Sequence, residues 1–387
     1  MIGLIHPRAY VESGHLEREY SELFRPAWLF AGLLLELEEG KHQGLRLADM
    51  EVLLQLDEAG RPRAFLNACS HRHTRLCEPG VHSGKVRCPY HFWVYDRNGV
   101  PVGIPSKQSF PDVLANPQSH RLREFECDAV GQFIFVRLSP AAGAPTLREY
   151  LGTQYGFLER ASEGMNRVLN EFREDVDANW KTVIENSLEG YHVPMVHSGS
   201  FMQIDGMSRE SAAPLFFFED ALHSHLEHAA DAEWVARFKR TEAKVGRWPW
   251  RFEHYTHHLI FPNLTVTSFM GYSFHVQRFD PVSPEKTRVH SRTVGVQFED
   301  ATAMGRKMME HIYADGHEFT RRVFAEDGEI CRKVQAGLRQ AQHYAVLGDG
   351  IEDRVAHFHR AYAAISSLTE IIRPTTMTGR VRATGST

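Results

Sequence analysis

The stretch CSHRHTRLCEPGVHSGKVRCPYHFW, residues 69–93, contains two pairs of candidate metal ligands. Cys69 and His71 form the pattern Cys-x-His, and Cys88 and His91 form the pattern Cys-x-x-His. Thiolates and imidazoles are the ligands of zinc sites and of some iron–sulfur clusters. The stretch therefore predicts a metal centre that is held by two loops.

The order of the ligands separates two kinds of centre. In a Rieske [2Fe–2S] cluster, two cysteines bind one iron and two histidines bind the other, so each loop would supply one ligand to each iron. Zinc ribbons and fingers more often place like ligands together, as in C-x2-4-C. The alternation of Cys and His between residues 69 and 91 favours the cluster, and a zinc site is the alternative.

Composition describes an ordinary globular chain. Its 387 residues are 42% hydrophobic and 24% charged, which is enough for two domains with sizeable cores. A formal net charge of −5 argues against nucleic acid or an anionic membrane as a partner. No apolar run is long enough to span a bilayer, and the first residues lack the pattern of a signal peptide, so we expect a cytoplasmic protein. Five cysteines do not suggest a disulfide framework.

The hydrophobic patterns predict an α+β protein with two main domains. Short alternating segments surround residues 69–93, so we expect an all-β domain over residues 41–140, preceded by a helical segment, 1–40, that packs on the C-terminal domain. Residues 141–375 are expected to form an antiparallel sheet flanked by helices, of the helix-grip type, and 376–387 a disordered tail. The main helices are expected at 176–192, 301–345 and 351–371.

A second set of candidate ligands lies on the predicted helix 176–192 and just after it. Glu189 and His192 lie opposite the apolar face, and His197 completes the pattern H-x4-H. Two imidazoles and one carboxylate form a facial triad that holds Fe(II). The pair alone is weak evidence, because 23 histidines produce such spacings by chance.

The carboxylate of such a triad must come from elsewhere in the chain. Glu326 and Asp327, within FAEDGEICRKVQAGL (324–338), are the candidates. The alternative is that these acids belong to a solvated helix face that is balanced by Arg321, Arg322 and Arg332.

Over nearly its whole length the chain resembles the large (α) subunits of Rieske non-haem iron oxygenases. The cluster motif of that family reads approximately C-P-H-R-G … C-P-Y-H-G-W, and this chain has CSHRH at 69–73 and CPYHFW at 88–93. The family's catalytic phrase corresponds to NWKTVIENSLEGYHVPMVH (179–197), and FPNL (261–264) and VQAGL (334–338) are also similar to family phrases.

The resemblance implies a role for each matched residue. Glu189 corresponds to an acid that links the two metal sites across a subunit boundary; it is more often Asp, and Glu is similar to the subset that acts on quaternary ammonium compounds. Asn186 is implied as a second catalytic residue. The implied [2Fe–2S] ligands are Cys69, His71, Cys88 and His91, and the implied mononuclear Fe(II) ligands are His192, His197 and Asp327.

Two residues depart from the family pattern. His73 and Phe92 replace the glycines that usually follow the cluster histidines. Glycine permits positive φ and a close backbone approach, so we expect the loops to differ here in geometry or in surface shape. All four ligands are present, so cluster binding should survive.

The implied function is that of a terminal oxygenase component that hydroxylates or oxidatively demethylates a small aromatic or N-methylated substrate. The resemblance implies O2 as co-substrate, a flavin reductase and in some systems a ferredoxin as electron donor, and a homotrimer to which a small β subunit can be added. One alternative is a ring dioxygenase that forms cis-dihydrodiols. Two further alternatives are a Rieske electron carrier and a zinc-binding protein without oxygenase activity.

Overall fold

The computed structural model describes residues 4–37, 40–203, 216–229, 232–249 and 254–365. Two seven-stranded sheets and one three-stranded sheet account for the strands of this part of the chain. No helix in these ranges is long and apolar enough to cross a membrane. The predicted tail, 376–387, lies outside them.

The N-terminal sheet has the strand order β1-β10-β9-β4-β3-β2-β5, and its neighbouring strands pair antiparallel. The strand β9 alternates between buried and more exposed residues, because one of its faces packs into the core, whereas β1 and β10 are buried along their whole length. The bounds are β1 Leu29–Leu33, β2 Lys41–Leu47, β3 Met50–Leu56, β4 Pro62–Leu66, β5 Gly80–Ser83, β9 Glu124–Val130 and β10 Phe133–Arg137.

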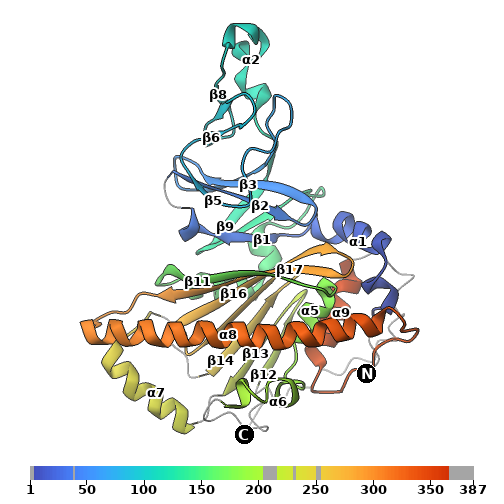
Figure 1. Ribbon diagram of the computed structural model, residues 1–387, viewed down its shortest axis with the longest axis vertical. Helices are drawn as coiled ribbons and strands as arrows, with labels where there is room; N and C mark the ends of the chain where they lie inside the picture. Colours follow the sequence, from blue (N-terminus) through green and yellow to red (C-terminus); the bar gives the residue numbers. More distant parts are fainter. Residues whose placement is uncertain (1–3, 38–39, 204–215, 230–231, 250–253, 366–387) are drawn as a thin grey trace.

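A small sheet, β6-β7-β8, stands beyond the N-terminal sheet and carries the loop with Cys88 and His91, whereas the loop with Cys69 and His71 follows β4. Its strands are β6 Val86–Arg87, β7 Val94–Tyr95 and β8 Pro101–Gly103. Asn98-Gly99 makes the turn between β7 and β8, and Gly99 has a φ of 76°. Figure 1 shows this unit projecting from one end of the molecule, far from the C-terminal sheet.

The C-terminal sheet has the order β11-β17-β16-β15-β14-β13-β12 and is antiparallel throughout. The long helix α8 crosses one face of it (Figure 1). The strands are β11 Met165–Val176, β12 Phe216–Asp220, β13 His223–Ala229, β14 His254–Ile260, β15 Leu264–Phe269, β16 Ser273–Ser283 and β17 Lys286–Val296. The fold class is α+β, as predicted.

The α-helices of the described ranges agree in the main with the sequence patterns. The predicted helix 301–345 is α8, and the predicted helix 351–371 is α9 as far as residue 365, after which it leaves the described residues. The bounds are α1 Ser13–Glu19, α2 Pro111–Ala115, α3 Leu147–Leu151, α4 Thr153–Ala161, α5 Trp180–Ser187, α6 Val193–Val196, α7 Ala232–Val245, α8 Ala303–Leu338 and α9 Asp353–Ile365. The predicted domain boundaries stay predictions, although β1 shows that part of segment 1–40 joins the N-terminal sheet.

The predicted helix 176–192 is wrong at both ends. The chain to Val176 belongs to β11, and Asn179 starts α5 by accepting a hydrogen bond from the backbone N–H of Lys181. At the other end α5 stops at Ser187, and the carboxylate of Glu189 accepts the backbone N–H groups of Tyr191 and His192. This local bond competes with the helix, so the chain turns before the short helix α6 begins.

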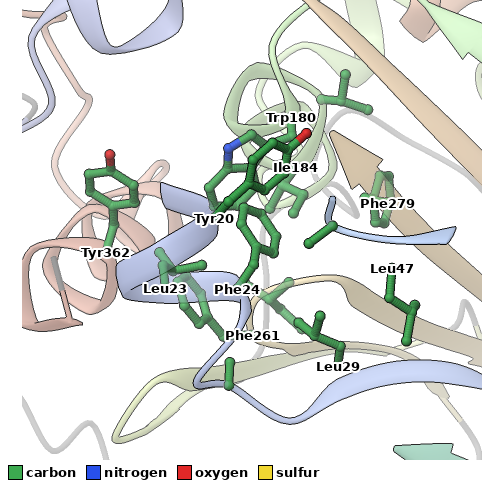
Figure 2. Close-up of a cluster of buried hydrophobic side chains, with 14 of the residues drawn as sticks. Tyr20, Leu23, Phe24, Leu29, Leu47, Trp180, Ile184, Phe261, Phe279 and Tyr362 are labelled. Carbon is green, nitrogen blue, oxygen red and sulfur yellow. The ribbon is translucent and has the colours of Figure 1, made fainter. Parts of the chain in front are cut away.

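The main core joins α5 to the N-terminal segment. Trp180 and Ile184 of α5 pack with Tyr20, Phe24 and Tyr362 in one buried cluster (Figure 2). Beneath it lies a fully buried ion pair, because the Nζ of Lys181 is 2.6 Å from Oε1 of Glu19 and both side chains have no exposed area. The indole N–H of Trp180 and the hydroxyl of Tyr362 also donate to Glu19. The helix that precedes the H-x4-H pair is therefore rigidly held.

Candidate metal centres

The two loops with the Cys and His pairs have the same backbone design. In the first loop the N–H of His73 donates to the carbonyl of Cys69 at 2.8 Å, and in the second the N–H of Phe92 donates to the carbonyl of Cys88 at 3.0 Å. His73 and Phe92 both have a φ of 59°. Each loop thus turns back on itself so that its cysteine and its histidine point to the same place.

The ligand atoms lie together, and the two imidazole nitrogens among them lack hydrogen-bond partners. Cys69 and Cys88 are buried, and their thiols interact with each other. The rings of His71 and His91 lie 4.7 Å apart between centroids, and the Nδ1 atom of each is buried without a hydrogen-bond partner. A buried polar atom without a partner is costly, so two orphaned imidazole nitrogens indicate a ligand that both face.

The spread of these four ligands fits a two-iron cluster better than one zinc ion. A tetrahedral zinc ion, at 2.0–2.3 Å from its ligands, would gather all four donor atoms within about 4 Å of one another. In the part of the chain that the structure describes, only His192, His197 and Asp327 bring three such donor atoms within 4.8 Å of one another. The four ligands of the loops are therefore spread more widely than a single zinc ion requires. The residues of the two loops form a thiol pair and an imidazole pair, which is the ligand arrangement of a Rieske cluster.

Aromatic residues enclose this centre. The indole of Trp93 stacks on the ring of His71 with centroids 4.9 Å apart and planes 4° apart. The hydroxyl of Tyr95 lies 3.0 Å from the sulfur of Cys69 and accepts the backbone N–H of Ser70. Because hydrogen bonds to the sulfurs tune the potential of such a cluster, Tyr95 would influence the potential of a cluster held here, and the sequence motifs did not identify it.

The two departures from the family pattern keep the left-handed backbone that glycine would favour. The φ angles of His73 and Phe92 therefore do not show the expected change in loop geometry. The difference from loops with glycine lies in the side chains on the surface. Phe92 is 52% exposed, and the guanidinium of Arg87 lies over its ring at 5.1 Å from the centroid. Tyr90 beside it is exposed to the same degree.

The second centre forms around α6 and the middle of α8. His192 and His197 flank α6, with Pro194 in its first turn, and Asp327 faces them from α8. The Oδ1 atom of Asp327 lies 3.4 Å from Nε2 of His192 and 3.0 Å from Nε2 of His197. Two imidazole nitrogens and a carboxylate at this separation can hold one divalent metal ion, as in the facial triad of non-haem iron enzymes.

Two glutamates orient the histidines. Nδ1 of His192 contacts Glu189, and Nδ1 of His197 lies 2.7 Å from Oε2 of Glu326. In both rings the carboxylate accepts the Nδ1 proton, which leaves Nε2 as the metal-facing atom. The geometry therefore gives the neighbouring acids different positions: Asp327 lies with the two Nε2 atoms, and Glu326 lies behind His197.

Further contacts fix the acids. Nδ2 of Asn186, on α5, donates to Oδ1 of Asp327 at 2.9 Å, and the hydroxyl of Ser200 donates to Glu326 at 2.5 Å. Glu326 as an orienting residue, and Ser200 with it, were missed by the sequence analysis, because the spacing of residues 129 positions apart carries no local signal. The alternative of a charged helix face holds in part, because Nε of Arg322 lies 3.6 Å from Oε1 of Glu326, while Arg332 pairs with Glu329 instead.

The electrostatics of the second centre favour a bound cation. Burial alone would raise the pKa of Asp327, but hydrogen bonds from His192 and His197 outweigh it and lower the pKa to about 2. Burial would lower the pKa of His192, but Asp327 and Glu189 raise it to about 9. Without a metal ion, the proton on His192 supplies the positive charge between the carboxylates of Asp327 and Glu189. A metal ion that binds here must displace this proton.

Comparison with known proteins gives two family matches. Residues 27–125 match the Rieske [2Fe-2S] domain, and residues 162–367 match the family described as ring hydroxylating alpha subunit (catalytic domain). The first match contains the Cys69–His91 loops, and the second contains the His192, His197 and Asp327 centre.

The chain is also similar to individual proteins of known activity. It is 31% identical over 207 residues to the glycine betaine monooxygenase oxygenase subunit of Chromohalobacter salexigens, a match that covers 51% of this chain and 44% of that protein. It is 28% identical over 190 residues to the anthranilate 1,2-dioxygenase large subunit of Burkholderia cepacia, with 47% and 44% covered. These matches thus span less than half the length of the curated relatives.

Solved structures share the fold over almost the whole chain. The quaternary ammonium Rieske monooxygenase CntA superimposes with a TM-score of 0.76 at 19% identity, covering 94% of this chain and 96% of that one. Naphthalene 1,2-dioxygenase from Rhodococcus sp. superimposes with a TM-score of 0.73 at 19% identity, covering 94% of both chains.

Proposed function

Because the chain belongs to the ring-hydroxylating alpha-subunit family and carries a Rieske [2Fe–2S] domain, we propose that it is a terminal oxygenase component. It uses O2 and electrons from a separate donor to hydroxylate or oxidatively demethylate a small organic substrate. The observation that carries the proposal is the convergence of His192, His197 and Asp327 in a domain separate from the cluster loops. A mere electron carrier would leave this second centre without a role.

Some side chains of the two centres would bind metal, and others orient the side chains that bind it. Fe(II) bound by His192, His197 and Asp327 would supply the chemistry of O2 activation. Glu189 and Glu326 hold the Nδ1 protons of the two histidines and so keep Nε2 free for the metal. Asn186 donates to the carboxylate of Asp327 and fixes its rotamer. In the N-terminal domain Cys69, Cys88, His71 and His91 would hold the cluster that supplies electrons singly.

Separation of the two centres within the chain supports transfer between chains. The small sheet with the cluster loops and helix α6 lie at opposite ends of Figure 1. A homotrimer in which the cluster loops of one chain meet the α6 region of the next would bring the centres together, and a small β subunit is compatible with it. Glu189 would then also accept a hydrogen bond from a cluster histidine of the neighbouring chain. Tyr191 beside it is 60% exposed, as an interface residue of a single chain would be.

The proposed donor is a flavin reductase, directly or through a ferredoxin, in the cytoplasm. The exposed Tyr90 and Phe92 and the basic Arg72 and Arg87 surround the cluster loops and would form part of its docking surface. His73 and Phe92 would alter this surface relative to family members with glycine.

An N-methylated or aromatic compound is the proposed substrate. Relatives of this chain are named glycine betaine monooxygenase, choline monooxygenase and N,N-dimethyl phenylurea N-demethylase, which supports hydroxylation or demethylation first. Others are named anthranilate 1,2-dioxygenase and biphenyl 2,3-dioxygenase, so cis-dihydroxylation of a ring is the second candidate.

A substrate screen with a surrogate reductase and isotopically labelled O2 tests the proposal. Gain of one labelled oxygen, gain of two, or loss of a methyl group identifies the reaction type by product mass. The control is His192→Ala, which should keep the visible spectrum of the cluster and form no product. Undiminished turnover in this variant would contradict the assignment of the second centre.

A further inference from the structure

Arg354, near the start of α9, is a buried cation without a complete set of partners. Its side chain is only 4% exposed and reaches β13 and β14 of the C-terminal sheet. Nε donates to the hydroxyl of Ser224 at 3.3 Å, and Nη2 contacts Nδ1 of His257 at 3.2 Å. Nη1 is buried and has no hydrogen-bond partner. An arginine normally uses all its donors when it is buried, and within the described residues this atom has no acceptor.

No carboxylate of the described ranges neutralises this guanidinium. Burial lowers the pKa of Arg354 to about 9, so it is still charged at neutral pH, and the group that acts on it in the opposite direction is Tyr255. Burial raises the pKa of Tyr255 to about 12, so this phenol is neutral and supplies no countercharge. A buried charge is costly unless it is paired.

The other titratable neighbours are imidazoles. Burial, together with the positive charge of Arg354, lowers the pKa of His257 well below its usual range, and His228 and His275 act on it in the same direction. On the opposite face of the same strands, burial is the main cause that lowers the pKa values of the imidazoles His225 and His258, and Arg354 acts on both in the same direction. These groups stay neutral near pH 7, so the charge of Arg354 is left uncompensated.

Contacts connect the helix of Arg354 to the metal-binding centre, because Nε2 of His359 on α9 lies 3.1 Å from Oε1 of Glu185 on α5, and the neighbouring Asn186 donates to Oδ1 of Asp327 at 2.9 Å. The rest of an anion that is paired with Arg354 would therefore extend toward the region between the sheet and α8. In that region Asp327 faces His192 and His197.

We propose that Arg354 binds the carboxylate of the substrate and holds the rest of it toward His192, His197 and Asp327. The inference rests on the proposed function and narrows its substrate to small monocarboxylates. A single guanidinium balances one negative charge, whereas a phosphate dianion would leave a second charge buried and unpaired. The forked donors of arginine match a carboxylate geometrically.

Binding to matched pairs of small molecules tests the proposal without turnover. The probes are benzoate with benzamide, anthranilate with 2-aminobenzamide, and glycine betaine with choline, where each pair differs in its carboxylate. Thermal unfolding and calorimetric titration of the metal-loaded protein report binding. We expect at least one carboxylate to bind and to raise the unfolding midpoint, and the partner that lacks the carboxylate to bind about ten- to a hundredfold more weakly. Equal binding within every pair, or no binding of any carboxylate, would overturn the proposal.

Two variants locate the effect. Arg354→Gln should weaken binding of the carboxylate about ten- to a hundredfold and leave binding of the partner without a carboxylate unchanged, and Arg354→Lys should restore part of the difference. Arg360→Gln, on the same helix, is the matched control, because Arg360 is partly exposed and pairs with Glu219. Unchanged discrimination in folded Arg354→Gln would contradict the role of this residue. If neither Arg354 variant folds, the matched pairs on the wild-type protein still decide the substrate class.

The outcome is independent of oxygenase activity. Selective carboxylate binding that depends on Arg354, together with no oxygenated product, would contradict the proposed function and leave the binding site standing. Oxygenation of neutral substrates alone, without carboxylate preference, would support the function and overturn the role of Arg354.

Discussion

His73 and Phe92 adopt a backbone conformation that favours glycine, and they do so at equivalent places in the two cluster loops. A side chain with a Cβ atom in the left-handed region costs about 1–2 kcal/mol, so the loops hold this conformation against a local preference. The loops' own hydrogen bonds and the buried cysteines impose it. The strain is the cost of presenting an imidazole and a phenyl ring on the surface around the cluster.

The first prediction concerns this strain. Phe92→Gly and Phe92→Ala both remove the ring and its contact with Arg87, but only glycine relieves the positive φ. We expect the glycine variant to be more stable than the alanine variant by about 1 kcal/mol. The check is the thermal midpoint for loss of the cluster's visible absorption. Equal midpoints would show that φ at this position is not strained.

A second residue-scale prediction concerns the orientation of His197. Glu326→Ala removes the acceptor of its Nδ1 proton, so the ring and its tautomer lose their support. We expect Fe(II) affinity to fall about 10- to 100-fold, with the cluster spectrum unchanged. Glu329→Ala, one turn along α8 and paired with Arg332 on the surface, is the control and should bind Fe(II) like the wild type. Wild-type affinity in Glu326→Ala would remove its orienting role.

At the scale of elements, local patterns predicted most strands and the helices α8 and α9, because their apolar periodicity is sustained over many residues. The same reasoning extended α5 too far, since Leu188 and Tyr191 continue the apolar spacing of the helix. Only the structure shows that the carboxylate of Glu189 accepts the backbone N–H groups of Tyr191 and His192, where the predicted helix would have continued. The break is what turns His192 and His197 toward α8.

The element-scale prediction tests how α5 is anchored. Glu19 accepts from Lys181, Trp180 and Tyr362, so Glu19→Ala would leave the buried ammonium of Lys181 without its countercharge. We expect a loss of about 3–5 kcal/mol of unfolding free energy, measured by urea denaturation. Glu22→Ala, which disturbs a partly exposed pair with Arg18, should cost about 1 kcal/mol or less. Similar losses in both variants would contradict the anchoring role of the buried pair.

At the scale of the molecule, the sequence already carried the two sets of ligands, because Cys69, His71, Cys88 and His91 are close in the chain, as are His192 and His197. The residues around these ligands come from distant elements, so no sequence spacing could predict the contact of Glu326 with His197. The sequence also could not identify Arg354, because the feature that distinguishes it is that its buried Nη1 atom has no hydrogen-bond partner among the described residues. Such contacts are properties of the folded chain and not of any one segment.

The most direct test of the account is a single turnover that joins both centres. The cluster is reduced chemically without O2, a substrate found in the screen is added, and O2 is then introduced while absorption and product are followed. The account predicts that the wild-type cluster is reoxidised with formation of product. Asp327→Ala should keep its cluster, reoxidise it slowly and form no product. Reoxidation and product formation at the wild-type rate in Asp327→Ala would contradict the account.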